Sequence, residues 1–277
     1  MNARITPALL LAALTTLASG NASTALAADG AAGATPAVGV AADPCVGVPV
    51  QPAAAHKAAK DTYEAWMHDW LSLDWGQRCR YRAENAALPP AGAQRVVLIG
   101  DSITEGWKEQ HASYFGPQRV DRGISGQVTE QMIVRMRSDV LELEPAVVHI
   151  MAGTNDVAGN RGPTTIALIE GNLATMAELS RAHGIRVVLA AVPPAAGFPW
   201  QPGLRPAGDI RTVNAWLRDY ARREHFTWVD YGAVLDDGAG GLRKEYSGDG
   251  VHPNAAGYAA MELLFEAAVT KALAAKR

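Results

Sequence analysis

Short apolar runs alternate with amphipathic segments along the chain once Pro89 and Pro90 have been passed. Each run is continuous, which is typical of a strand buried on both faces of a parallel sheet. In the segments between the runs, apolar residues recur every three or four positions, which is the period of a helix with one buried face. The pattern predicts an α/β domain in which helices cover both faces of a parallel sheet.

The predicted strands are residues 95–100, 120–123, 146–151, 185–191 and 227–229. The predicted helices are residues 129–143, 164–183, 209–225 and 254–275, and one more is expected to start at Ser102. In such a sheet, ligands bind beyond the carboxyl ends of the strands, near the point where the strand order changes direction. The residues that directly follow each strand are therefore the candidates for a functional site.

The first 27 residues have a different pattern from the rest of the chain. They combine a single charged residue, Arg4, an apolar run at residues 7–17 and the small residues that end at Ala27. This order is typical of a secretory signal peptide cleaved after Ala27. The run is too short to span a bilayer, and no later apolar segment reaches the roughly 20 residues that a spanning helix needs. We therefore expect a secreted or periplasmic protein without stable membrane insertion.

Two further segments precede the α/β pattern. Residues 28–55 are mostly Ala, Gly, Pro and Val, which predicts a linker. Residues 56–92 are interpreted as an N-terminal helical segment that packs on a domain of residues 93–277. Its helix is expected to extend to about Ala87, because five apolar residues recur on one helix face: Tyr63, Trp66, Met67, Trp70 and Leu71.

Composition and charge narrow the class of protein. The chain has 277 residues, 48% of them hydrophobic, which suffices for one large domain or two small ones. There are 25 Lys and Arg against 28 Asp and Glu, so the sequence offers no basic excess for a nucleic-acid partner.

Cys45 and Cys79 are the only cysteines of the sequence. In an oxidising compartment the two are expected to pair, and two free thiols are the alternative. The sequence does not show whether the two residues meet in space, so both states stay open.

Polar motifs stand at the ends of the predicted strands. GDSIT (residues 100–104) follows the first strand, RGISGQ (122–127) the second, and GTND (153–156) the third, while DGVHP (249–253) lies past the fifth strand. Each motif alone is a common turn composition. Together they bring a hydroxyl, an imidazole, carboxylates and amide donors to one edge of the sheet, which indicates a hydrolytic site.

The four motifs resemble the signature blocks of the SGNH (GDSL-type) hydrolase family. Those blocks carry Ser, Gly, Asn and His in that order, with an Asp three residues before the His, and the resemblance covers about residues 93–270. GDSIT stands where the motif that names the family reads GDSL. The resemblance implies a flavodoxin-like three-layer α/β/α sandwich with a five-stranded parallel sheet. It also implies activity as an esterase, lipase, thioesterase or carbohydrate deacetylase.

The chemistry of the motif residues suggests a role for each. Ser102 is the candidate nucleophile, His252 the general base, and Asp249 the acid that orients the imidazole. By resemblance, the oxyanion hole consists of the backbone N–H groups of Ser102 and Gly126 and the side-chain amide of Asn155. The alternatives are a helix-capping serine, a histidine at a helix start, a turn glycine and a loop-capping amide.

Three other polar residues of these strands and motifs receive non-catalytic interpretations. Asp101 and Asp156 are expected to hold the loops together, and His149, inside a predicted strand, is expected to belong to the core. The sequence has no H-E-x-x-H motif, no cysteine cluster and no dinucleotide-binding glycine motif. We therefore expect no metal and no other cofactor.

The substrate is expected to be a small-molecule ester with a short acyl group, an acetyl group first, on a carbohydrate or a lipid. The loop at residues 192–208 holds Phe198 and Trp200, which are expected to form an aromatic rim of the site. Trp107, with Tyr114 and Phe115, is expected to contribute from the first crossover. The alternative is that these aromatic rings only pack the loop onto the protein. Two alternatives remain: a lysophospholipase or thioesterase for longer chains, and a non-catalytic carbohydrate-binding protein on the same fold.

Overall fold

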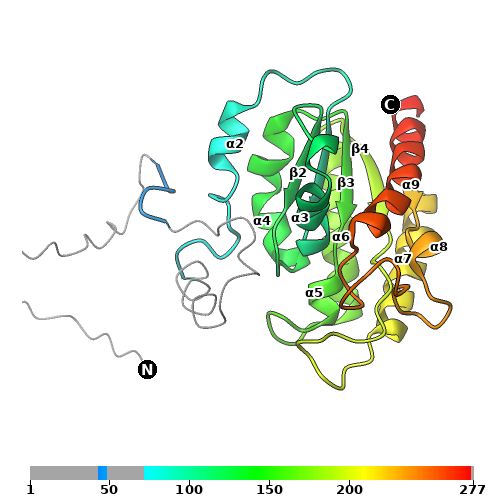
Figure 1. Ribbon diagram of the computed structural model, residues 1–277. Helices are drawn as coiled ribbons and strands as arrows, with labels where there is room; N and C mark the ends of the chain where they lie inside the picture. Colours follow the sequence, from blue (N-terminus) through cyan, green and yellow to red (C-terminus); the bar gives the residue numbers. More distant parts are fainter. Residues whose placement is uncertain (1–42, 49–71, 276–277) are drawn as a thin grey trace, which may run out of the picture. The chain divides into compact units, whose positions relative to one another are not determined.

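Five parallel strands form the centre of the protein, in the order β2-β1-β3-β4-β5 (Figure 1). The computed structural model describes residues 43–48 and 72–275. The strands are β1 (Val96–Gly100), β2 (Arg119–Gly123), β3 (Val147–Met151), β4 (Arg186–Ala190) and β5 (Thr227–Val229). All five strands were predicted, and each observed end lies within one residue of the predicted one.

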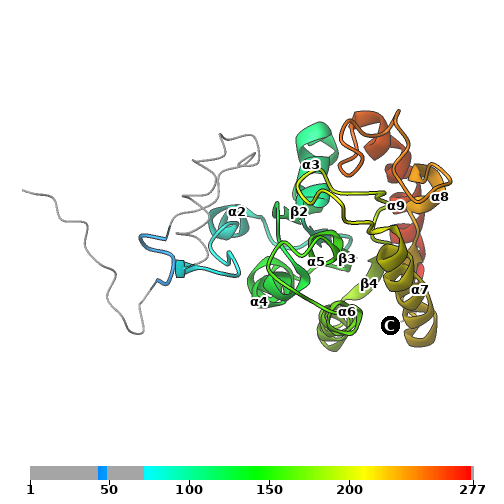
Figure 2. The ribbon, with the colours of Figure 1, turned by 90° about the horizontal axis from the view of Figure 1, so that it is seen from below.

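Helices cover both faces of the sheet (Figure 2). One face carries α4 (Thr129–Asp139), α6 (Ile166–Ala182) and α7 (Ala207–Glu224), and the other carries α3 (Ser102–Gln110), α8 (Gly232–Leu235) and α9 (Ala255–Ala274). The side chains of β1 alternate between these layers, because successive strand residues point to opposite faces. Val97 and Ile99 pack with α4 and α6, whereas Val96 and Leu98 pack with α3 and α9. The predicted three-layer α/β/α fold is confirmed.

The strand order places the functional end of the sheet. After β1 the chain adds β2 on one side, and it then crosses to add β3 on the other side of β1. Val97 of β1 is in register with Val120 of β2 and with Val148 of β3. In a sheet of this order, the crevice at the carboxyl ends of β1 and β3 is the place where ligands bind.

Short elements complete the described part of the chain: α2 (Arg82–Ala87), α5 (Thr154–Val157) and the 3-10 turns η2 (Ala112–Tyr114) and η3 (Leu141–Leu143). The helix predicted at residues 129–143 is divided. It ends as α4 at Asp139, and η3 follows after the non-helical Val140. Among the described residues, no helix has both the length and the apolar character needed to cross a membrane.

The N-terminal helical segment differs from the prediction where it is described. The predicted signal peptide, most of the linker and residues 56–71 lie outside the described residues. From Asp74 to Tyr81 the chain forms turns instead of a continuous helix, because Asp74 accepts a hydrogen bond from the Cys79 N–H (2.8 Å) and Gln77 is left-handed (φ 52°). Cys45 and Cys79 are joined by a disulfide, with their Cα atoms 5.6 Å apart.

Candidate active site

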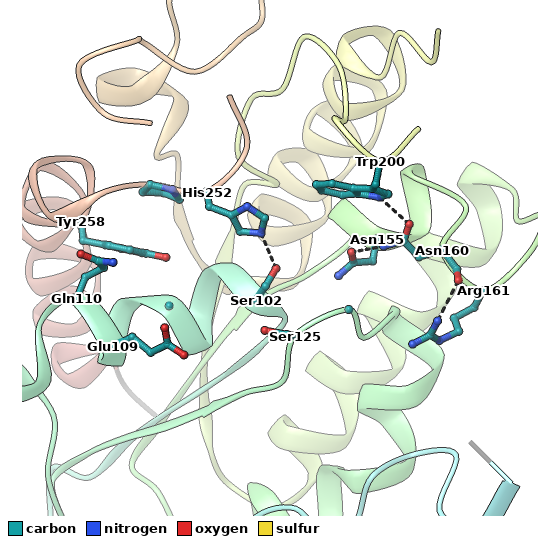
Figure 3. A pocket seen from close by; sticks show the side chains of 13 residues that line it. Ser102, Glu109, Gln110, Ser125, Asn155, Asn160, Arg161, Trp200, His252 and Tyr258 are labelled. Atoms are coloured by element: carbon teal, nitrogen blue, oxygen red, sulfur yellow. Dashed lines mark hydrogen bonds between the residues drawn. The ribbon is translucent and has the colours of Figure 1, made fainter. Parts of the chain in front are cut away.

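A pocket of about 450 Å³ opens at the carboxyl ends of β1 and β3 (Figure 3). Its volume lies within the range of small-molecule sites. Most of the side chains that line it are polar, and Trp200, Pro253 and Tyr258 supply apolar surface. The lining residues are Ser102, Gly106, Glu109, Gln110, Ser125, Gly126, Asn155, Asn160, Arg161, Trp200, His252, Pro253 and Tyr258.

Ser102 is the first residue of α3, and Asp101 alone separates it from the end of β1. Asp101 caps the helix by accepting a hydrogen bond from the Ile103 N–H at 2.9 Å, the structural role expected of it. The helix start lies tightly against the end of β2, where a methyl group on Gly123 would approach the Glu105 nitrogen to 2.1 Å. The close approach requires glycine at this position, and it fixes the helix end that carries the hydroxyl.

One face of α3 forms a wall of the pocket. Ser102, Gly106, Glu109 and Gln110 follow the i, i+4, i+7, i+8 spacing of a single helix face, and all four line the cavity. Trp107 lies on the opposite face and is completely buried. The sequence spacing alone predicts which residues of this helix face the pocket once Ser102 is taken as the nucleophile.

The prediction that Trp107 contacts substrate is therefore wrong. Its indole packs in the layer between the sheet and α9, with Tyr258 at 5.6 Å and Phe265 at 5.5 Å between ring centroids. Tyr114 and Phe115 pack around the same indole and do not line the pocket. This aromatic cluster stabilises the fold beneath the site by burying large apolar surfaces.

His252 lies between Ser102 and Asp249. The Ser102 Oγ is 2.9 Å from the His252 Nε2, and the His252 Nδ1 is 2.7 Å from the Asp249 Oδ2 (Figure 3 shows the first contact). Because an ionised carboxylate only accepts hydrogen bonds, Nδ1 carries the proton. The Nε2 lone pair then faces the serine hydroxyl.

A tight turn holds the acid and the imidazole. The Asp249 Oδ1 accepts hydrogen bonds from the backbone N–H groups of Val251 (2.9 Å) and His252 (2.8 Å). The Ser247 hydroxyl donates to the His252 carbonyl oxygen at 2.8 Å and accepts from the Gly250 N–H at 2.9 Å. The geometry of this side of the site therefore depends on residues that are close in sequence.

The same contacts shift the ionisation of the pair. Partial burial disfavours the charged Asp249, but hydrogen bonds from the His252 ring and from two backbone N–H groups outweigh it and lower its pKa well below the ordinary value. Partial burial likewise favours the neutral His252 ring. The hydrogen bond and charge of Asp249, with the charge of Asp101, outweigh it and raise the pKa of His252. Asp249 is thus ionised wherever His252 titrates.

Gly126 lies in the loop between β2 and α4 and lines the pocket beside Ser102. Its φ of +78° is a conformation that favours glycine, and its N–H has no hydrogen-bond partner among the described residues. The preceding residue, Ser125, is anchored through its N–H (2.9 Å) and its hydroxyl to the buried carboxylate of Glu105. Glu105 therefore fixes the loop that presents Gly126.

Asn155 occupies the start of α5, after β3, and is 3% exposed. Its side-chain Nδ2 donates to the Gln127 carbonyl oxygen at 2.9 Å, and its Oδ1 accepts from the Asn160 Nδ2 at 2.6 Å. Since an amide nitrogen carries two protons, one N–H remains for the pocket. Ser102, Gly126 and Asn155 thus lie together around one cavity.

A buried arginine, Arg135, connects the ends of β1 and β2 with the loop that carries Gly126. Arg135 of α4 is completely buried and donates to the carbonyl oxygens of Gly100 (3.0 Å) and Arg122 (2.8 Å), which lie near the ends of β1 and β2. It also donates to the Gln127 Oε1 (2.6 Å) and pairs with the buried Asp139 (3.1 Å). Sequence reasoning missed this residue, because on a predicted helix an arginine is expected at the surface.

The N-terminal segment supports the same loop from outside the sheet. The Gln127 Nε2 donates to the Gly76 carbonyl oxygen (3.1 Å), and the buried Tyr81 hydroxyl donates to the Gly123 carbonyl oxygen. The disulfide at Cys79 lies between these two contacts along the chain. The segment predicted to pack on the domain therefore contacts the loop that carries Gly126.

The aromatic rim is formed by one of the two residues expected there. Trp200 is 40% exposed, lines the pocket, and has its ring centroid 6.0 Å from that of His252. Phe198 is 3% exposed and stacks on Trp200 at 5.2 Å. Phe198 does not line the pocket, because the loop turns its ring inward to support the tryptophan.

The remaining polar residues have structural positions, as expected from the sequence. Asp156 accepts hydrogen bonds from the Thr129 N–H (3.0 Å) and hydroxyl. His149 is completely buried in β3, where its Nε2 contacts the Tyr231 hydroxyl at 3.0 Å. Burial lowers the pKa of His149 to about 3, so the ring is neutral. No group of three or more His, Cys, Asp and Glu side chains within residues 43–48 and 72–275 is arranged to hold a metal ion.

A hydroxyl, an imidazole and a carboxylate in series are the arrangement that activates a serine for attack on a carbonyl. Unpaired N–H groups beside the hydroxyl are the donors that stabilise the developing oxyanion. The pocket geometry therefore suits acyl transfer through a serine.

Comparison with known proteins agrees with this chemistry. The sequence pattern of the GDSL-like Lipase/Acylhydrolase family matches residues 98–260. The esterase TesA of Pseudomonas aeruginosa is 30% identical over 179 residues, which are 59% of this chain and 81% of that protein. An uncharacterized lipoprotein, YqeF of Bacillus subtilis, is 32% identical over 116 residues, 35% of this chain and 48% of that protein.

A solved structure extends the comparison to three dimensions. A GDSL-like lipase of Bacteroides thetaiotaomicron is 41% identical and superposes with a TM-score of 0.70, covering 72% of this chain and all of that chain. The four strand-end motifs all lie within residues 98–260, which the family pattern matches. The chain therefore belongs to the GDSL-like lipase/acylhydrolase family, and it is a carboxylic ester hydrolase.

Proposed function

We propose that this hydrolase is an exported serine esterase that removes short O-acyl groups, with a preference for acetyl, through an acyl-enzyme on Ser102. The observation that carries the proposal is the unbroken series from Ser102 Oγ to His252 Nε2 (2.9 Å) and from His252 Nδ1 to Asp249 Oδ2 (2.7 Å). The series opens into the pocket beside Gly126 and Asn155.

Acylation begins when His252 takes the Ser102 proton at Nε2 while Oγ attacks the carbonyl carbon of the ester. The carbonyl π bond opens, and the oxygen becomes an oxyanion facing the N–H groups of Ser102, Gly126 and Asn155. Asp249 stabilises the imidazolium that forms. The ester C–O bond then breaks, and the alcohol leaves with the proton from Nε2.

Deacylation repeats these steps with water. His252 takes a proton from the water as its oxygen attacks the acyl carbon, and a second tetrahedral oxyanion forms. The bond to Ser102 Oγ then breaks, and the proton on Nε2 returns to the serine. The free acid leaves, and Ser102 and His252 return to their starting states.

The lining of the pocket supports a short acyl group and a polar alcohol. Long acyl chains need a continuous apolar channel, whereas the apolar surface of this pocket is interrupted by the polar side chains of Asn155, Asn160, Arg161 and Gln110. Trp200 offers an exposed ring beside His252, and a flat indole is a suitable platform for the apolar face of a sugar. These features support an acylated carbohydrate as the natural substrate.

Three observations support export. The first 27 residues have the order of a signal peptide, Cys45 and Cys79 form a disulfide, and one relative is a lipoprotein. Disulfides persist mainly in oxidising compartments. We propose that cleavage near Ala27 releases the mature enzyme to the periplasm or the medium, where residues 28–55 act as a linker.

The test is hydrolysis of p-nitrophenyl esters from acetate to laurate by the native protein and by Ser102→Ala. We expect kcat/KM to be highest on acetate, to fall with chain length, and to be lost in the variant. Acetylated sugars are assayed next, with Trp200→Ala as the probe of the sugar platform. A preference for laurate would overturn the short-acyl proposal, and full activity in folded Ser102→Ala would overturn the serine mechanism.

A further inference from the structure

A line of hydrogen bonds runs from the exposed rim of the pocket to its buried end. The Trp200 Nε1 donates to the Asn160 Oδ1 at 2.9 Å, and the Asn160 Nδ2 donates to the Asn155 Oδ1 at 2.6 Å (Figure 3). The Asn155 Nδ2 then donates to the Gln127 carbonyl oxygen at 2.9 Å. Each donor in this line is followed by an acceptor on the next residue, so Trp200 is connected to the Asn155–Asn160 segment and through it to Gln127.

Both ends of this line have fixed hydrogen-bonding character. The indole N–H of Trp200 only donates, and the backbone carbonyl of Gln127 only accepts. The orientation of each amide between them follows, because reversing either one would place two donors or two acceptors against each other. Asn155 is therefore held with its nitrogen, and not its oxygen, toward Gln127 and the pocket.

We propose that Asn160 and Trp200 are positioning residues that orient the side-chain amide of Asn155 toward the oxyanion. The inference rests on the oxyanion role proposed for Asn155. A donor that must meet an oxyanion within a few tenths of an ångström gains from a fixed rotamer, since reorientation during the reaction would cost activation energy.

The surroundings of the two residues suit this role. The Asn160 backbone N–H also donates to the Asn155 carbonyl oxygen (3.0 Å), so the two asparagines are braced through main chain and side chain. Trp200 is held from behind by Phe198, with ring centroids 5.2 Å apart. Since Trp200 is 40% exposed and also neighbours His252, a substrate resting on its ring contacts the start of the line.

Two substitutions interrupt the line at different bonds. Asn160→Asp still accepts from Trp200, but a carboxylate cannot donate to the Asn155 Oδ1 and instead repels it. Trp200→Phe keeps an aromatic ring next to Phe198 and removes the indole N–H, together with part of the ring surface. Trp216→Phe is the matched control, because Trp216 lies on α7, stacked on Tyr220 at 4.7 Å, and does not line the pocket.

We expect kcat on p-nitrophenyl acetate to fall about 10- to 100-fold in Asn160→Asp and about 3- to 10-fold in Trp200→Phe. KM is expected to stay within about twofold for Asn160→Asp, because the lost interaction is made in the transition state. Affinity for phenylboronic acid, which forms a tetrahedral adduct on a catalytic serine, should fall by the same factor as kcat/KM. Trp216→Phe is expected to keep the native kcat.

The outcomes separate this inference from the proposed function. Asn155→Ala is measured in parallel and is expected to lose about 100-fold or more in kcat. If it does so while folded Asn160→Asp and Trp200→Phe keep the native kcat and boronate affinity, the positioning role is refuted and the oxyanion role stands. If Asn155→Ala itself keeps the native kcat, the oxyanion role fails and the inference with it. A lowered melting temperature with unchanged boronate affinity indicates a purely structural role and also overturns the inference.

Discussion

Asp249 and His252 are held by a turn that closes between Ser247 and Pro253, whereas Gly126 and Asn155 are held by contacts from widely separated segments. We call the part of the pocket with Asp249 and His252 the base side, and the part with Gly126 and Asn155 the oxyanion side. The base side is also open to solvent: the side chains of Asp249 and His252 are 41% and 38% exposed. On the oxyanion side, Asn155 is 3% exposed, and the supporting Arg135 is completely buried. One side is a local turn, and the other is part of the core.

This difference implies that the two sides respond differently to substitution. Groups on the base side keep solvent as an alternative partner, so their loss affects the chemistry more than the fold. On the oxyanion side, buried polar groups satisfy one another, and removing one leaves its partners unpaired in the interior. Substitutions there are expected to lower stability and activity together.

The largest effect is expected for His252→Ala on the base side. Without a base for Ser102, kcat falls by about 10⁴-fold or more, which corresponds to roughly 5 kcal/mol or more in the transition state. The melting temperature should hardly change, because Asp249 keeps its two backbone hydrogen bonds. Kinetics and thermal unfolding measure the two effects.

His183→Ala serves as the control for that substitution. His183 is an exposed residue at the end of α6, and its replacement is expected to leave kcat within about twofold of the native value. A marked fall in the melting temperature of His252→Ala, without one in His183→Ala, would show that the base side also belongs to the core.

The next largest effect is expected for Arg135→Met on the oxyanion side. The substitution leaves Asp139 buried without its ion-pair partner and removes one donor from each of the carbonyls of Gly100 and Arg122. Removing one partner of a buried pair costs about 3–5 kcal/mol of unfolding free energy. We also expect kcat to fall, since the Gln127 side chain loses one of its two hydrogen bonds. Urea unfolding and kinetics test both effects.

Arg137→Met is the matched control, since Arg137 is exposed on the same helix. Its unfolding free energy is expected to change by no more than about 0.5 kcal/mol. Equal stability losses in the two variants would contradict the role assigned to Arg135.

The smallest effect is expected for Ser247→Ala. Loss of its hydrogen bonds loosens the turn and weakens the contact between Asp249 and His252, at a cost of about 1 kcal/mol. Asp249 keeps the pKa of His252 raised, so a weaker contact lowers that pKa toward its ordinary value. Catalysis needs neutral His252, and the activity lost as pH falls should therefore be lost at a lower pH than in the native enzyme.

The pH profile of kcat/KM measures this shift, and Ser113→Ala, an exposed serine of η2, is the control. A profile that moves to higher pH, or moves equally in both variants, would contradict the account.

The sequence predicts the parts of the molecule that depend on periodicity and local motifs. The five strands are continuous apolar runs, and the Asp249–His252 spacing is a local signal, so both are visible without the structure. The boundary of α4 was missed because Val140 leaves the helix although the apolar pattern continues into η3. The apolar pattern indicates which residues are buried, and the leucines of η3 are buried just as the apolar residues of α4 are. The pattern therefore does not show where the helix ends.

The rest depends on contacts between distant segments. The first crossover, in which Trp107 lies, predicts that this residue contributes to the site, yet five positions along a helix from Ser102 it faces the core. Arg135 carries no local signal, because it owes its role to strand ends brought near by folding, and the contact of Asn160 with Trp200 likewise joins distant parts of the chain. The base side could therefore be predicted from the sequence in more detail than the oxyanion side.

Covalent labelling of the nucleophile tests the central claim most directly. Diethyl p-nitrophenyl phosphate transfers its diethylphosphoryl group to an activated serine hydroxyl and releases p-nitrophenolate. We predict that a single group attaches at Ser102, located by mass spectrometry of peptides, and that activity disappears in proportion to labelling. His252→Ala should label far more slowly. Attachment at another residue, or full activity in the fully labelled protein, would contradict the assignment of Ser102 as the nucleophile.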